Sequence, residues 1–132
     1  MKSTDELIHQ IKEQKKGDLS FLDEKEYNGP SISVYLCDLL TENQMEVREA
    51  IKKLGLERTY GYQMFNGTRK PTRTMLVRLG LLLKLSLEEV NRLLKIGGKE
   101  ALYPRRREDA AAIYAIEKKL SLEEWEDMLE EL

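Results

Sequence analysis

The sequence predicts an all-α protein, and three observations lead to this expectation. Leu, Glu, Lys, Ala and Arg, which have high helix propensity, dominate the 132 residues. No long stretch alternates between apolar and polar residues with the period of two that is typical of a half-buried strand. Apolar residues recur instead at helical spacing, between stops made by Gly, Asn-Gly and Pro.

Composition restricts the class of protein further. With 41% hydrophobic and 35% charged residues, the chain has material for one core and a heavily charged surface. No apolar run approaches the roughly 18–20 residues of a membrane span, and the N-terminus has no signal-peptide core. A single Cys excludes an internal disulfide, and one Cys with one His cannot form a standard zinc site. We therefore expect a cytoplasmic protein with no membrane contact, no metal and no cofactor.

The first region, residues 1–30, is predicted to be an N-terminal helix followed by a linker. The helix covers residues 4–16, where Ser3 or Thr4 is a suitable cap and Asp5 and Glu6 favour the positive N-terminal end. Gly, Asn and Pro residues break the pattern between positions 17 and 30. His9, the only His, is expected to lie on the surface of this helix.

The second region, residues 31–98, is predicted to hold five helices. Their expected ranges are residues 31–43, 46–54, 57–65, 72–83 and 87–96. Gly55, Asn66-Gly67 and Gly97-Gly98 end three of them, and Pro71 precedes the fourth. Cys37 lies among apolar residues of the first and is expected to be a small buried side chain.

The third region, residues 99–132, is predicted to be a pair of helices over 106–119 and 122–132. Its sequence LSLEEWEDML at 120–129 repeats LSLEEVNRLL at 85–94, either as an internal duplication or as one helix-start phrase used twice. Ser86 and Ser121 would each open a capping box. The stripe around Trp125 is expected in the core or in a dimer surface, and Arg105 to Arg107 either contact phosphate or an acidic partner or form a solvated helix start.

Charge is distributed unevenly along the chain. The formal net charge is -2, but residues 31–96 carry 11 basic and 7 acidic side chains, whereas both flanking segments are net acidic. A basic middle segment is compatible with a face that binds DNA, although clustering of solvated charges gives the same pattern.

The segment that points to a function is MEVREAIKKLGLERTYGYQMFNGTRKP, residues 45–71. Gly55 would form a sharp turn between two short helices that pack through Leu54, Leu56 and Met64. The second helix then has Glu57, Arg58, Thr59, Tyr62 and Gln63 as its outward candidates. Arg, Thr and Gln are side chains that read base edges.

Residues 31–97, which include this segment, resemble the lambda-repressor-like, or xenobiotic-response-element, helix-turn-helix family. The resemblance rests on AIKKLGLERTYGYQMFNGTRKP and TMLVRLGLLLKLSLEEVNRLL. It implies a five-helix DNA-binding domain whose third helix enters the major groove. The residues implied to read bases are Arg58, Thr59, Tyr62 and Gln63, and those implied to contact the DNA backbone are Asn66, Thr68, Arg69, Lys70 and Arg73.

The sequence departs from the family pattern at several positions. Val47 stands where the family often has Gln, and Glu46 is a poor helix cap. Gly61 replaces an inward aliphatic residue, and we expect the ring of Tyr60 or Tyr62 to fill its place. Glu57 would repel phosphate, although a carboxylate can accept a hydrogen bond from cytosine.

The expected function is that of a transcription regulator that binds double-stranded DNA as a homodimer, with no enzymatic activity. No Gly-rich phosphate loop, nucleophile elbow or metal-spaced motif is present. The alternative is an all-helical protein-interaction module, antitoxin-like or adaptor, that binds a protein partner through its C-terminal helices. The acidic ends of the chain and Gly61 in the recognition helix favour this alternative.

Overall fold

A computed structural model describes residues 4–13 and 31–132, which form two units, residues 1–31 and residues 32–132. In these ranges all regular structure is helical and no strand occurs, as predicted. The predicted linker, and positions 14–16 of the first predicted helix, lie outside the described residues. No helix within the described ranges has the length and apolar character needed to cross a membrane.

The first unit contains α1, Thr4–Glu13. His9 lies on its exposed surface, as expected, and its Nε2 is 2.9 Å from a carboxylate oxygen of Glu13 one turn later. The second unit is treated by itself below.

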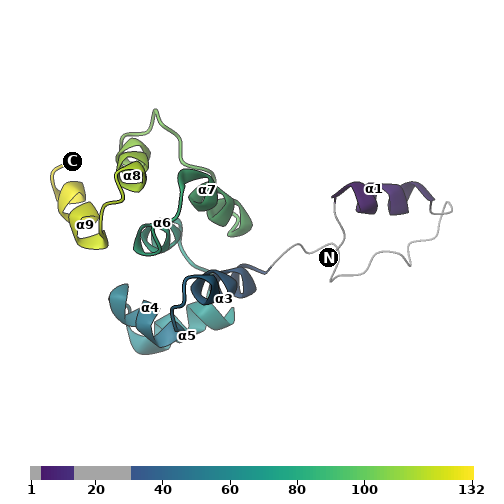
Figure 1. Cartoon of the computed structure of the whole chain (residues 1–132), viewed down its shortest axis with the longest axis horizontal. Coiled ribbons are helices and arrows are strands. Elements are labelled where there is room, and N and C mark those ends of the chain that lie inside the picture. Colours follow the sequence, from purple (N-terminus) through teal and green to yellow (C-terminus); the bar gives the residue numbers. More distant parts are fainter. Residues whose placement is uncertain (1–3, 14–30) are drawn as a thin grey trace. The chain divides into compact units, whose positions relative to one another are not determined.

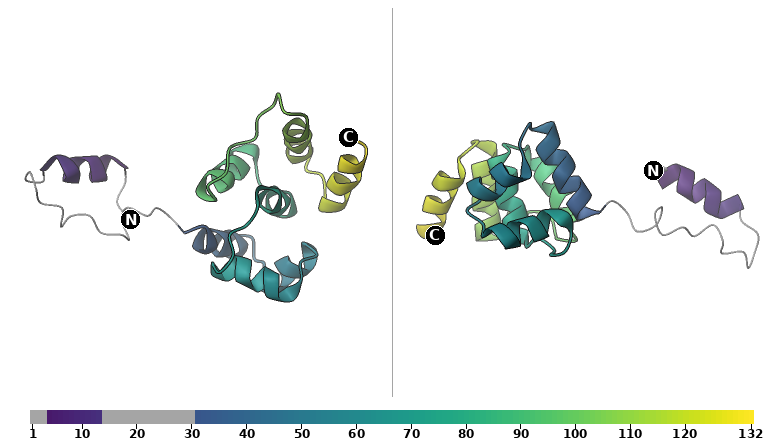
Figure 2. Two further views of the ribbon diagram at one scale, coloured as in Figure 1. Left: turned by 180° about the vertical axis from the view of Figure 1, so that it is seen from behind. Right: turned by 90° about the horizontal axis from the view of Figure 1, so that it is seen from below.

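The second unit is built from seven helices within residues 32–132 (Figure 1). They are α3 (Ile32–Glu42), α4 (Val47–Lys53), α5 (Arg58–Asn66), α6 (Arg73–Leu82), α7 (Leu87–Ile96), α8 (Arg107–Glu117) and α9 (Leu122–Glu130). Helices α3, α4 and α5 pack together, and α6 packs against α7, α8 and α9. Both views of Figure 2 show α8 and α9 at the end of the unit away from α3.

One hydrophobic core runs through this unit. Its members include Leu36 and Leu40 of α3, Ile51 of α4, Leu79 of α6 and Trp125 of α9, each at most 6% exposed. Trp125 therefore belongs to the core, which was one of the two places expected for it. Because the core is shared, the predicted division between residues 31–98 and 99–132 separates helices that pack within one unit.

Tight corners of one kind join four helix pairs. Each has one residue with positive φ after the first helix: Gln44 (56°), Gly55 (68°), Lys84 (56°) and Lys119 (54°). The N–H of the following apolar residue then donates to the carbonyl five residues earlier, over 2.9–3.0 Å. This backbone bond occupies a carbonyl that the helix end would otherwise leave without a partner.

At two of these corners the helices meet at the same register, four residues before and six residues after the positive-φ residue. At the α4–α5 corner these positions are Ile51 and Gly61, and a Cβ built on Gly61 would lie only 2.7–2.9 Å from three side-chain carbons of Ile51. At the α6–α7 corner the glycine is on the first helix instead of the second, and Gly80 contacts Val90. The expectation that Tyr60 or Tyr62 fills the space at Gly61 is therefore wrong, since Ile51 from the neighbouring helix occupies it.

The repeated LSLEE phrase has one structure at both sites. Ser86 and Ser121 each form the predicted capping box, with Glu89 and Glu124 as the reciprocal partners. The residues before them also face one another: Lys84 Nζ donates to the carbonyl of Lys119 over 2.8 Å, and Lys119 Nζ donates to that of Lys84 over 3.0 Å. The two corners are thus joined by a reciprocal pair of hydrogen bonds.

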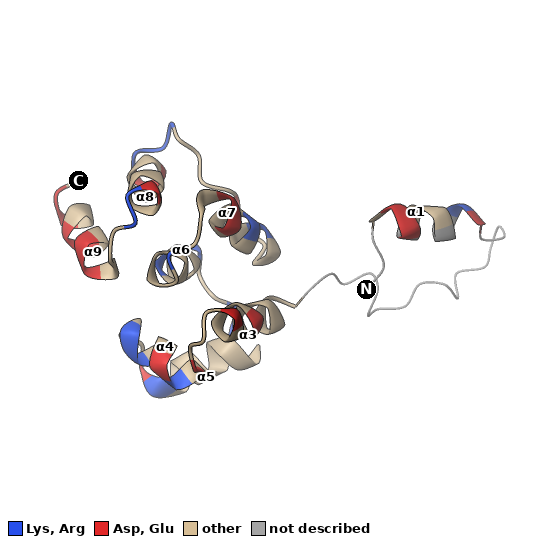
Figure 3. Ribbon diagram, in the orientation of Figure 1, with Lys and Arg blue, Asp and Glu red and all other residues tan. Residues whose placement is uncertain are grey.

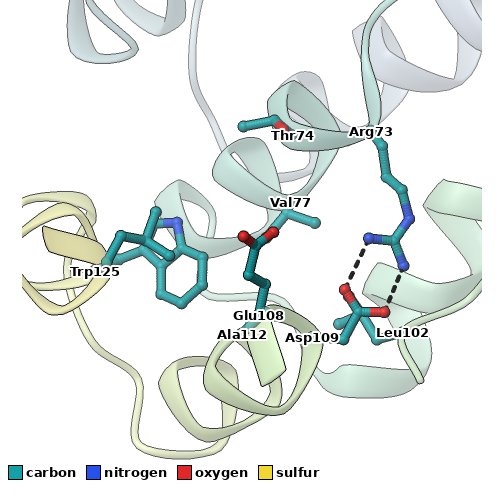
Figure 4. Close-up of a pocket in the computed structure, with 9 residues that line it drawn as sticks. Arg73, Thr74, Val77, Leu102, Glu108, Asp109, Ala112 and Trp125 are labelled. Atoms are coloured by element: carbon teal, nitrogen blue, oxygen red, sulfur yellow. Dashed lines mark hydrogen bonds and ion pairs between the residues drawn. The ribbon is translucent and has the colours of Figure 1, made fainter. Parts of the chain in front are cut away.

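Two arginines of α6 connect the C-terminal helices to the rest of the unit. Arg73 forms a bidentate pair with Asp109 of α8, with both N–O distances 2.9 Å (Figure 4). Arg78 donates to the carbonyl of Leu54 over 2.8 Å and to Glu126 of α9 over 2.9 Å. Helix α9 is therefore linked through one guanidinium to the corner between α4 and α5.

Candidate nucleic-acid interface

The α4–α5 corner has the helix-turn-helix arrangement that residues 45–71 predict. Gly55 adopts φ 68°, and the N–H of Leu56 donates to the carbonyl of Ile51 over 3.0 Å. Leu54 and Met64 are buried and Leu56 is half-buried, as expected for residues that hold the two helices together. Helix α5 is thereby fixed with its other side in solvent.

Glu57 is the N-cap of α5. Its carboxylate accepts the backbone N–H groups of Thr59, over 2.9 Å, and Tyr60, over 2.8 Å. These two hydrogen bonds lower the pKa of Glu57, that of Tyr60 having the larger effect, so the carboxylate is ionised at neutral pH. Glu57 is thus already used by the helix, although the sequence presents it as an outward candidate beside the base-reading residues.

The predicted base-reading residues lie on the accessible side of α5. Arg58 and Thr59 are exposed in the first turn, Tyr62 is 37% exposed, and Gln63 is half-buried. The guanidinium carbon of Arg58 is 5.9 Å from the centre of the Tyr62 ring, within cation–π range. The N-terminal half of α5 therefore presents a cation beside an aromatic ring, while the Thr59 side chain hydrogen-bonds with the Glu57 carboxylate.

Gln63 and Arg69 are joined, although the sequence assigns them to different tasks. Arg69 Nε donates to Gln63 Oε1 over 2.9 Å, and the guanidinium carbon lies 5.6 Å from the centre of the Tyr60 ring. The Arg69 N–H also donates to the Gln63 carbonyl over 3.1 Å. These contacts hold the Arg69 side chain beside the accessible side of α5.

The loop after α5 carries the remaining predicted backbone contacts. Asn66 Oδ1 accepts the N–H of Thr68 over 2.9 Å, which leaves the Asn66 amide N–H groups as donors. Gly67 caps α5 with φ 92°. Asn66, Thr68 and Lys70 are all exposed, and Lys70 makes no ion pair or hydrogen bond with any described residue.

Arg73 does not fit the backbone-contact assignment. Besides the pair with Asp109, its guanidinium donates to the carbonyls of Glu100 and Ala101 over 3.3 and 3.2 Å. Asp109 raises the pKa of Arg73, chiefly through their hydrogen bond. The side chain is therefore occupied in holding the C-terminal helices, and we remove Arg73 from the interface.

Arg48 is a residue that the sequence analysis missed. It lines, with Ile51, Arg58 and Tyr62, a surface hollow of about 230 Å³ between α4 and α5. No carboxylate lines this hollow, whereas Glu46 and Glu49 line the adjoining one with Arg48 and Lys52. The sequence signal for this residue is the one-turn spacing of Arg48 and Lys52, directly after Val47, which departs from the family pattern.

The candidate interface has side chains of both charges at one edge and basic side chains at its centre. Figure 3 shows Lys and Arg where the end of α4 meets the start of α5, with acidic residues elsewhere on α4. Lys52 and Lys53 are exposed in the last turn of α4, where cations also interact favourably with the helix dipole. The basic centre is thus formed by Arg48 and Arg58, whereas Lys52 lies at the mixed edge with Glu46 and Glu49.

No group of three His, Cys, Asp or Glu side chains in residues 4–13 and 31–132 is arranged to hold a metal ion. Cys37 is half-buried rather than fully buried, and its thiol donates to the carbonyl of Phe65 over 3.5 Å. Burial, with a smaller contribution from Asp38, raises the pKa of this thiol.

Comparison of the chain with protein-family models, with curated proteins and with solved structures finds no match.

Proposed function

We propose that this protein is a sequence-specific regulator of transcription that binds double-stranded DNA, with α5 in the major groove. The observation that carries the proposal is the α4–α5 hollow, where Arg48 and Arg58 converge beside Tyr62 without any lining carboxylate. A duplex provides the matching chemistry, since phosphates flank a groove of base edges.

The residues divide into two roles in this proposal. Arg58 and Thr59 lie in the first turn of α5, where side chains of a recognition helix reach base edges. Arg48 on α4 lies beside that first turn, whereas Asn66, Thr68 and Lys70 lie at the C-terminal end of α5 and in the loop after it. These two positions suit contacts with phosphates on either side of the groove. Gln63 and Arg69 act as a joined pair at the other end of α5.

A homodimer belongs to the same proposal. One short recognition helix reads few base pairs, so helix-turn-helix proteins pair two of them on half-sites about one helical turn, or about 34 Å, apart. The preferred DNA would then be palindromic.

The direct test is selection of the purified protein on random duplex DNA, followed by titration of the selected duplex at several salt concentrations. We expect a palindromic motif and an affinity that falls steeply with salt, because phosphate contacts release counterions. Flat, weak affinity with no enriched motif would contradict the proposal.

The second candidate is the protein-interaction module. The observations that favour it are Glu46 and Glu49 beside Arg48, and the acidic helix α9. Two results together would favour this candidate over DNA binding. A pull-down with this chain as bait would recover one partner protein in stoichiometric amount, and the chain itself would show no salt-dependent affinity for DNA.

A further inference from the structure

We propose that α8 and α9 form a self-complementary surface on which a second copy of this chain docks, with α8 of one protomer against α9 of the other. The α8 outer face consists of Arg107, Ala110, Ala111, Tyr114 and Lys118, and the α9 outer face of Glu123, Asp127, Glu130 and Glu131. This inference locates the interface of the homodimer in the proposed function and rests on that part of it, but association is measured without DNA, so a failure to dimerise is distinguishable from a failure to bind DNA.

Both outer faces point away from the body of the unit. Helix α8 buries Asp109, Ala112, Ala115 and Ile116, and α9 buries Trp125, while both helices pack against α6. The residues of the two outer faces recur at three- and four-residue intervals on the opposite sides of these helices. Neither outer face is therefore covered by the other helices of the unit.

The α8 outer face is basic and partly apolar. Tyr114 is 54% exposed, and Lys118 Nζ lies 6.0 Å from the centre of its ring. Ala110 and Ala111 are small, so another helix can approach α8 closely. Arg105 and Arg106 extend the positive charge into the exposed segment before α8, whereas the exposed carboxylates Glu108 and Glu117 border this face on either side.

The α9 outer face is acidic and unpaired within the described residues. Glu124 is used in the capping box and Glu126 pairs with Arg78, so neither is counted in this face. The remaining four carboxylates are exposed, and none forms an ion pair with a described Lys or Arg. Figure 3 shows this contrast, with Asp and Glu (red) along α9 and Lys and Arg (blue) in the segment that leads into α8.

Charge complementarity points to a second copy as the partner. Because the basic and acidic faces lie on adjacent helices of one chain, a two-fold axis can place each basic face on an acidic one, so both pairs form at once. Exposed ion pairs contribute only about 0–1 kcal/mol each, so they select the partner and its orientation. Burial of the Tyr114 ring and of the alanines supplies the apolar contact.

The test uses two charge-reversed variants of the full chain and their mixture. Variant one is Arg107→Glu with Lys118→Glu, which makes both outer faces acidic. Variant two is Asp127→Lys with Glu130→Lys and Glu131→Lys, which leaves Glu123 as the one carboxylate of the α9 outer face and makes both faces predominantly basic. Molar mass is measured by light scattering after size exclusion, and circular dichroism checks that each variant keeps its helices. All of these residues are exposed, so the substitutions leave the core unchanged.

We expect the unchanged protein to have twice the chain mass of 15.4 kDa, and each variant alone to have the mass of one chain. The equimolar mixture should again form two-chain particles, since acidic faces then meet basic ones. A matched control, Arg92→Glu with Lys95→Glu on the exposed side of α7, should leave the dimer intact. A monomeric unchanged protein, an open series of larger masses, variants that remain dimeric, or a mixture that stays monomeric would each overturn the proposal.

Discussion

Position 61 shows how a single residue determines whether two helices can meet. Gly is about 1 kcal/mol less favourable than Ala inside a helix, yet Gly61 lies in the middle of α5. Ile51 explains this, because three of its side-chain carbons lie within 2.9 Å of the place where a Cβ would be. Two of them are bound to its Cβ, so they cannot move away by rotation of a flexible end.

We predict that Gly61→Ala destabilises the protein by about 1–2 kcal/mol, because overpacking of a core outweighs the gain in helix propensity. The same change in an Ile51→Ala background should have the opposite sign, since the clashing carbons are gone. Urea unfolding of the four proteins in this cycle gives both values. If Gly61→Ala is stabilising in both backgrounds, Ile51 is not the reason for the glycine.

The candidate site residues whose exposure agrees with the sequence prediction are those placed by local signals. Arg58, Thr59 and Lys70 follow from their place after a helix-turn-helix signature, and the structure places all three in solvent. Arg73 could not be assigned, because its partner Asp109 is 36 residues away. Glu57 could not be assigned either, since a Glu at a helix start is equally suited to capping and to facing a ligand.

The helices themselves were largely predictable from local signals. In residues 31–132 every predicted helix is present, and its ends lie within two residues of the observed ones. Gly55, Gly67 and Ser86 mark ends through backbone conformation or capping, which depend on neighbours in sequence. The packing of α8 and α9 onto α6 was not predictable, because long-range contacts of Arg73, Arg78 and the two lysines secure it.

Helix α8 depends on one buried ion pair. Asp109 is 3% exposed, and its carboxylate accepts from Arg73 and from the N–H of Tyr103. Asp109→Ala should destabilise the protein by about 2–3 kcal/mol, less than the roughly 3–5 kcal/mol of a fully buried pair, since the Arg73 side chain is 29% exposed. Thermal unfolding followed by the fluorescence of Trp125, which lines the same pocket, measures the loss.

The Arg73–Asp109 pair also makes the free energy of unfolding depend on pH in the acidic range. Arg73, followed by the N–H of Tyr103, lowers the pKa of Asp109 against the opposing effect of burial. The unfolded carboxyl, with a pKa of about 3.9, takes up a proton first, so this stabilisation is complete above that value. It is lost as the pH falls through the lower pKa of the folded state, and Asp109→Asn should flatten this part of the pH profile of unfolding. A profile unchanged by Asp109→Asn would show that the acid sensitivity has another source.

For the molecule as a whole, the distribution of charge over the surface determines which charged partners it attracts more than the net charge does. A net charge of -2 predicts no attraction to DNA, yet the hollow between α4 and α5 is lined by two arginines and no carboxylate. Acidic residues are most frequent on α9, although Glu46 and Glu49 line the adjoining hollow. One unit therefore carries a basic patch and an acidic patch, and salt weakens the attraction of each for an oppositely charged partner.

The measurement that tests the DNA-binding account most directly is the affinity of Arg58→Ala, compared with Lys70→Ala, for the selected duplex and for a scrambled one across a salt series. Arg58→Ala should cost about 1–3 kcal/mol, or about 5–150-fold, on the selected duplex and much less on the scrambled one. Lys70→Ala should weaken both duplexes alike and reduce the salt slope by about one contact. If Arg58→Ala leaves affinity and discrimination intact, α5 is not the recognition helix and the central claim fails.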